Sequence, residues 1–277
     1  NYSSAMAWFL KAANRGFAEG QYSIGWLYQH GDGVLQDYAK AMDWYQKAAD
    51  QGYAPAQSNV GILHQHGHGV PQDYTKAMNW FQKAADQGYT VAQSFIGALY
   101  KHGDGVPQDY KKAMYWYRKA ANQGDANAQA HIGLLHQDGH GVPQDYTKAM
   151  DWYRKAADQG YADAQICIGW LHQYGHGVPK NYTKAMFWCL KAADQGHATA
   201  MFSIGYLYEH GLGVTRDFAD ALVWYRKAAN NGHSDAKAYI SRLERQQQGQ
   251  YQHQQQKHSG GTQQAKKKMG LFKKLFN

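Results

Sequence analysis

Cysteine, proline and long apolar runs are all scarce in this sequence. Its 277 residues include two cysteines and five prolines, and two cysteines are too few for the disulfide framework of a small secreted domain. No run approaches the roughly 20 consecutive apolar residues of a membrane-spanning helix. Signatures of a nucleophile elbow, a phosphate-binding loop, a dinucleotide site or paired catalytic carboxylates are also missing. These absences argue against a disulfide scaffold, an integral membrane protein and the common enzyme classes.

Acidic residues are missing from the C-terminal end of the chain. The formal net charge is +8, and residues 246–277 contain six lysines and no Asp or Glu, which leaves +2 for residues 1–245. The high isoelectric point therefore belongs largely to this end. A nearly neutral remainder does not favour nucleic acid as a partner.

A repeat of 36 residues accounts for most of the chain. One copy, beginning at Asp73, reads DYTKAMNWFQKAADQGYTVAQSFIGALYKHGDGVPQ, and the copies follow one another without insertion or deletion. They occupy residues 1–36, 37–72, 73–108, 109–144, 145–180 and 181–216, with a partial copy at 217–245. Because one copy is too short to bury its own apolar face, residues 1–245 are expected to form a single stack.

Each copy contains two helical patterns. Repeat positions 2, 5, 6, 9, 12 and 13 are apolar at helical spacing, after an N-capping Asp at position 1 and before a glycine at position 16. Positions 20, 24 and 27 are mostly Ala, Ile and Leu, and this spacing indicates a second helix. Glycine at position 25 indicates a neighbouring helix too close for a β-carbon, and glycines at positions 31 and 33 mark a turn. The predicted fold is an all-α, right-handed α-solenoid of stacked helix-turn-helix repeats.

The run KAMDWYRKAADQGYADAQICIGWLHQYGHGVP resembles the Sel-one-like repeat (SLR), which is related to the tetratricopeptide repeat and is also called HCP-like. The matching features are Ala-x-x-Trp-Tyr/Phe-x-Lys-Ala-Ala, the glycine after the first helix, Ala-Gln, Ile/Val-Gly-x-Leu and Gly-x-Gly-Val. The resemblance covers residues 1–245. It implies a non-enzymatic adaptor that assembles other proteins. This chain lacks the cysteine pattern of the disulfide-bonded bacterial relatives.

The resemblance also allows two other functions. One is a membrane-associated regulatory subunit of an enzyme, of the wall-synthesis or quality-control type, anchored by the basic C-terminal end. The other is a repeat-fold hydrolase like that of some bacterial relatives, although no nucleophile or metal cluster is evident here. The favoured prediction is a protein-binding scaffold with no catalytic residues, no metal and no cofactor.

Histidines and cysteines are the residues that most suggest chemistry. HQHGHG places His64, His66 and His68 on alternate positions, but other copies carry Tyr, Asp or Leu there, so we interpret the segment as a polar turn. Cys189 replaces the aromatic residue of position 9, and both it and Cys167 are expected to be reduced, unreactive thiols. A disulfide between them across adjacent copies is the alternative. Tryptophan at position 8 is interpreted as packing in the interior or between repeats, and a ligand-stacking ladder is the alternative.

A partner surface is expected at repeat positions whose residues differ between copies while the core positions stay the same. Positions 3, 7, 10 and 14 form a stripe on the first helix, opposite its core face, and large side chains gather there in copies 4 to 7. The predicted partner-binding residues are Tyr115, Arg118, Arg154, Phe187, Leu190, Val223 and Arg226.

The end of the chain divides into a Gln-rich linker, residues 246–264, predicted to be disordered, and a basic amphipathic tail, residues 265–277. The tail is predicted to contact an anionic membrane or an acidic partner through Lys266, Lys267, Lys268, Leu271, Phe272, Lys273, Lys274, Leu275 and Phe276. Asn1 falls at the start of a copy without an initiator Met, which suggests that upstream residues are missing. Two reduced cysteines favour the cytoplasm.

Overall fold

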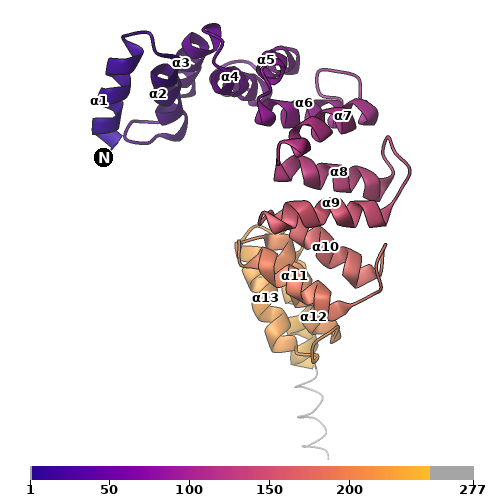
Figure 1. The fold of residues 1–277 in the computed structure, drawn as a ribbon. Helices are drawn as coiled ribbons and strands as arrows, with labels where there is room; N and C mark the ends of the chain where they lie inside the picture. The colour runs from indigo at the N-terminus through magenta and orange to yellow at the C-terminus, as the bar shows by residue number, and fades with distance from the viewer. Residues whose placement is uncertain (1, 250–277) are drawn as a thin grey trace, which may run out of the picture. The chain divides into compact units, whose positions relative to one another are not determined.

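The computed structural model describes residues 2–249, and every regular element in that range is an α-helix (Figure 1). The helices are α1 (Tyr2–Ala13), α2 (Ala18–His30), α3 (Tyr38–Asp50), α4 (Ala54–His66), α5 (Tyr74–Asp86), α6 (Thr90–His102), α7 (Tyr110–Asn122), α8 (Ala126–Asp138), α9 (Tyr146–Asp158), α10 (Ala162–Tyr174), α11 (Tyr182–Ala193), α12 (Ala198–His210) and α13 (Phe218–Asn230), followed by a helical segment at 236–249. The predicted all-α repeat solenoid is confirmed.

The helix ends follow from the residues at the boundaries. The side chain of Asp73 accepts a hydrogen bond from the Lys76 backbone N–H at 2.9 Å, which satisfies a free amide in the first turn of α5. After the first helix, Gly88 has φ +84°, and after the second, Gly103 has φ +79°. Both lie in the left-handed region that a residue with a β-carbon rarely adopts. The predicted caps and turn glycines are therefore confirmed.

The core consists of small and aromatic side chains at the predicted positions. In the second copy, Ala41, Tyr45 and Ala48 from α3 are fully buried against Val60 and Leu63 from α4. A small residue at every third or fourth position allows the two helices to approach closely, while one large ring fills the space between copies.

The glycine at position 25 is explained by that ring. A β-carbon on Gly61 in α4 would lie 2.6 Å from Cε1 of Phe81 in α5, and one on Gly97 in α6 would lie 2.8 Å from Cδ1 of Tyr117 in α7. Close approach was predicted, and the approaching group is the position-9 ring of the next copy. At Gly169 the group is the smaller Sγ of Cys189, 3.1 Å away.

A row of paired glutamines also joins successive copies. Gln57, which is buried, donates from Nε2 to the Ala49 carbonyl at 3.2 Å and accepts at Oε1 from Nε2 of Gln87 at 2.8 Å. The same pairing joins Gln93 to Gln123. The buried Gln57 amide is thus satisfied by its own copy and by the copy that follows.

The array divides into two compact units. The N-terminal unit contains Asn1–Ala164 and His176–Val178, and the C-terminal unit contains Gln165–Gly175 and the residues from Pro179 onward. No helix in the described range is both long enough and apolar enough to cross a bilayer.

Candidate functional site

The predicted stripe in the N-terminal unit is exposed. Just over half of the Tyr115 surface is accessible, its ring meets Trp116 edge-on at 5.4 Å, and Nζ of Lys119 lies 4.9 Å from its centroid. Arg118 and Arg154 are exposed as well. These side chains are accessible to a partner, and whether they bind one stays a prediction.

The predicted residues of the C-terminal unit are also on the surface. Phe187, Leu190 and Val223 are exposed apolar side chains. Nη2 of Arg226 is 2.7 Å from Oε1 of Glu244, so this guanidinium already has a partner within the chain. The predicted tail residues, from Lys266 to Phe276, lie outside the described range.

Tryptophan at position 8 has a packing role. Trp80 is half-buried against the core of the preceding copy, and Nζ of Lys83 lies 3.8 Å from its ring centroid. Trp152 has the same arrangement with Lys155 at 4.0 Å. Because one face packs on protein and a lysine covers the ring, Trp80 and Trp152 do not offer open rings for a ligand.

The histidines of the turn also have structural contacts. His68 stacks on Tyr38 with 4.5 Å between ring centroids, and Nδ1 of His66 is 3.0 Å from the Ile62 carbonyl oxygen. His140 stacks on Tyr110 in the same way. Within residues 2–249, no three His, Cys, Asp or Glu side chains gather in a way that could hold a metal ion. These contacts indicate that the histidines of HQHGHG help to hold the turn.

Cys167 and Cys189 are not joined by a disulfide. Cys189 is fully buried, and burial raises the pKa of its thiol to about 12. Cys167 is half-buried. A thiol with such a raised pKa is almost entirely protonated at neutral pH and is a poor nucleophile.

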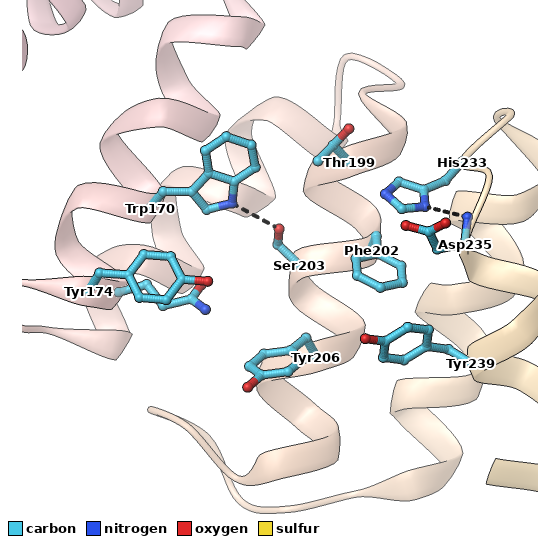
Figure 2. A pocket seen from close by; sticks show the side chains of 10 residues that line it. Trp170, Tyr174, Thr199, Phe202, Ser203, Tyr206, His233, Asp235 and Tyr239 are labelled. Carbon is cyan, nitrogen blue, oxygen red and sulfur yellow. Dashed lines mark hydrogen bonds between the residues drawn. The ribbon is translucent and has the colours of Figure 1, made fainter. Parts of the chain in front are cut away.

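An aromatic groove lies on the second-helix face of the C-terminal unit (Figure 2). It has a volume of about 320 Å³. Its walls come from α10, α12, helix 236–249 and the segment that leads into that helix. The lining residues are Trp170, Gln173, Tyr174, Thr199, Phe202, Ser203, Tyr206, His233, Asp235 and Tyr239. Trp170 and Tyr174 are among the exposed large hydrophobic residues of the protein. We refer to these ten residues as the aromatic groove.

The floor and one end of the aromatic groove are held rigidly. Phe202 is stacked on His233 with 4.2 Å between centroids and meets Tyr239 edge-on at 4.8 Å. Arg242 lies 4.5 Å from the Tyr239 ring centroid and forms a salt bridge with the buried carboxylate of Glu209. A groove whose rings are fixed by their neighbours loses little side-chain entropy when a ligand binds.

Ser203, His233 and Asp235 line the same groove but are not arranged as a catalytic triad. Nε1 of Trp170 donates to Oγ of Ser203 at 3.4 Å. Nδ1 of His233 accepts from the backbone N–H of Asp235 at 3.3 Å, and its ring is stacked on Phe202. No hydrogen bond between Ser203 and His233 is present among the described residues. The serine therefore has no positioned general base.

The N-terminal unit has a hollow of about 330 Å³ on its own second-helix face, between α6 and α8. Its polar groups are already paired: Oγ of Ser94 donates to Asp125 at 2.9 Å, and Nδ2 of Asn127 donates to the Tyr161 hydroxyl at 2.8 Å. Burial lowers the pKa of its His131 to about 4, helped by the charges of Lys101 and His102. This hollow offers a ligand fewer open rings than the aromatic groove does.

The aromatic groove was not predicted from the sequence. The signal was available at repeat position 26, which reads Trp26, Ile62, Ala98, Leu134, Trp170, Tyr206 and Arg242. The side chains at this position range in size from alanine to tryptophan and include one arginine. Core positions dominate the pattern of the second helix, and the aromatic residues of its variable face form a cluster only when successive copies stack.

Comparison with known proteins identifies the repeat. The Sel1 repeat model matches residues 1–17, 18–53, 54–89, 90–125, 126–161, 162–197 and 198–233. Its units begin at the second helix of each predicted copy, with the same period. No match was found among curated proteins.

Solved structures give the same result. One is a protective antigen of uropathogenic Escherichia coli strains that displays an SLR fold, with 38% identity, a TM-score of 0.72 and coverage of 88% of this chain. This chain spans 52%, about half, of that protein. A Sel1 repeat protein from Oxalobacter formigenes has 34% identity and a TM-score of 0.76, with 82% of this chain and 91% of that one covered.

An immunity protein from Pseudomonas aeruginosa shares the fold at 22% identity and a TM-score of 0.55, with 78% and 83% of the two chains covered. The repeat match extends over most of the described residues, and the Oxalobacter protein is matched over nearly its whole length. The chain belongs to the Sel1 repeat family.

Proposed function

We propose that this chain is a non-catalytic scaffold that binds segments of other proteins, and that the aromatic groove is its principal binding surface. Sel1 repeat proteins are generally scaffolds for protein interaction and typically lack catalysis. The observation that carries the proposal is the cluster of Trp170, Tyr174 and Tyr206 on one rigid, accessible face of α10 and α12. Tryptophan and tyrosine are the usual anchors of protein interfaces.

The chemistry of the groove favours binding over reaction. Its serine and histidine are not paired, and its one carboxylate, Asp235, is exposed. Aromatic rings supply large contact areas at low entropy cost, and the polar groups between them fix orientation.

A displayed library of random peptides tests this function. The full chain is used for selection, and the double variant Trp170→Ala/Tyr206→Ala is used for counter-selection. We expect enriched peptides that bind the full chain and bind the double variant at least about tenfold more weakly, as for hot-spot truncations. Trp8→Ala, which removes an exposed tryptophan from the N-terminal unit, is the matched control. Peptides that bind all three proteins equally would contradict the proposal.

The first-helix stripe is a second predicted surface. The triple variant Tyr115→Ser/Phe187→Ser/Leu190→Ser changes it without altering any residue of the aromatic groove. If the groove is the principal surface, the variant keeps its affinity for the selected peptides. Loss of that binding would transfer the proposed function to the stripe.

The membrane-associated alternative depends on residues 265–277, outside the described range, and no contact in the described part favours it. Sedimentation of the full chain with anionic vesicles tests it. Binding to vesicles that is abolished when the tail lysines are changed to glutamine would support the alternative.

A further inference from the structure

We propose that the aromatic groove recognises a proline-rich segment in the polyproline II conformation. The proposal rests on the proposed function and names the chemical class of the partner. Three properties of the groove support it: its rings on successive second helices, the polar groups beside them and its nearly neutral charge.

The arrangement of the rings follows from the repeat. Trp170 and Tyr206 occupy the same repeat position, on α10 and α12, and the indole of Trp170 reaches Ser203 of α12. Both rings therefore line the same groove. A polyproline II helix has three residues per turn, so prolines three residues apart lie on one side of the segment and can face such a row of rings together.

Tyr174 lies one helical turn beyond Trp170, so the two rings face the groove from the same side (Figure 2). Phe202 and Tyr239 close the other side. A groove lined by aromatic rings on two sides is the kind of site in which proline-rich segments dock in the polyproline II conformation.

Hydrogen-bond donors are placed where such a backbone needs them. The carbonyl groups of a polyproline II segment have no internal partners. The indole N–H of Trp170 makes a hydrogen bond of 3.4 Å to Ser203, beyond the usual 3.2 Å limit for this type, and it can be given up to a peptide carbonyl. The hydroxyls of Tyr206 and Tyr239 and the amide of Gln173 add further donors on the same surface.

Charge in the groove is low and localised. Asp235 is the one carboxylate among its lining residues, while nearby Arg242 is paired with Glu209. A highly charged partner would gain little here. The Asp235 carboxylate, at one end of the groove, suits a single basic residue flanking the prolines and would set the direction in which the segment lies.

Fluorescence anisotropy of the full chain with a labelled peptide tests the proposal. The probe is an arginine followed by eight prolines, and the reference is an arginine followed by alternating alanine and glycine of equal length. We expect the proline probe to bind at least about tenfold more tightly, because it is already ordered in the bound conformation. Equal binding of the two peptides would overturn the proposal.

Variants separate the contributions of the groove residues. Trp170→Ala should weaken proline-probe binding at least about tenfold, while Trp170→Phe, which keeps a ring and loses the N–H, should weaken it about threefold. Asp235→Asn should weaken binding about threefold and reduce its salt dependence. The matched controls are Trp8→Ala and Asp194→Asn, an exposed aspartate of the same unit outside the groove, and both should bind as the parent does.

The two proposals can fail separately. If library-selected peptides depend on Trp170 and Tyr206 but the proline probe does not bind, the groove binds proteins and the assigned partner class is wrong. If neither binds, both proposals are wrong. Circular dichroism on each variant shows whether a loss of binding reflects loss of the helical fold.

Discussion

At the scale of single residues, the glycine of repeat position 25 determines how closely neighbouring copies pack. Its hydrogen faces a Tyr or Phe ring in five of the six full copies and Sγ of Cys189 in the sixth. A mid-helix glycine costs about 1 kcal/mol of helix propensity relative to alanine. The tight ring contact shows why the fold accepts that cost.

The C-terminal unit allows a matched test of this contact. A β-carbon on Gly205 would lie 2.7 Å from Cδ1 of Tyr225, and one on Gly169 would lie 3.1 Å from Sγ of Cys189. Overpacking costs about 1–3 kcal/mol, whereas the propensity gain is about 1 kcal/mol. We expect Gly205→Ala to lower the urea midpoint and Gly169→Ala to leave it almost unchanged. Equal losses would show that the ring contact is not the reason for the glycine.

The capping aspartates give the fold a dependence on pH. The backbone N–H three residues along the chain is the largest influence that lowers the pKa values of Asp37, Asp73 and Asp145. Because their folded pKa values are depressed, their stabilisation is complete above the unfolded pKa of about 3.9. It is lost as the pH falls through the folded values.

Replacing these three caps with asparagine should remove that dependence. Asn181 already caps α11, accepting from the Lys184 backbone N–H at 2.9 Å, so a neutral cap is compatible with the fold. We expect the triple variant Asp37→Asn/Asp73→Asn/Asp145→Asn to lose less stability than the parent between pH 5 and pH 2, as followed by urea midpoints. The same loss on acidification in both proteins would contradict this account.

At the scale of elements, the helices were predictable and the contacts between copies were only partly so. The N-cap at Asp73 and the turn at Gly88 depend on neighbours in the sequence, so the repeat pattern was enough to predict them. The pairing of Gln57 with Gln87 depends on how one copy sits on the next. In sequence, both glutamines resemble ordinary polar surface residues.

The paired glutamines should stabilise the fold as well as fix how one copy sits on the next. Gln57→Ala removes a buried amide that bonds on two sides, and leaves the Ala49 carbonyl and the Gln87 amide without it. We expect a loss of about 1–3 kcal/mol in the free energy of unfolding. The control is Gln46→Ala in α3, which removes a half-buried amide whose hydrogen bond to Asp50 lies within one helix. A pair four residues apart on a helix is worth less than about 0.5 kcal/mol, so this change should have little effect. Equal losses of stability for Gln57→Ala and Gln46→Ala in urea denaturation would show that the paired glutamines do not stabilise the contact between copies.

At the scale of the whole molecule, the repeat separates stability from function. Positions that build the core stay nearly constant, whereas position 26 changes from Ala98 to Trp170 without disturbing the frame. The candidate site could not be derived from one copy, because its residues come from three successive second helices. The predicted exposure of Tyr115 and Phe187 was confirmed, but their role was not tested.

The most direct test of the central claim is hydrogen exchange of the full chain with and without a saturating library-selected peptide. The account predicts added protection in α10, α12 and residues 236–249, where the aromatic groove lies, and little change in α7 and α11. Protection confined to α7 and α11, which carry Tyr115 and Phe187, would contradict the claim.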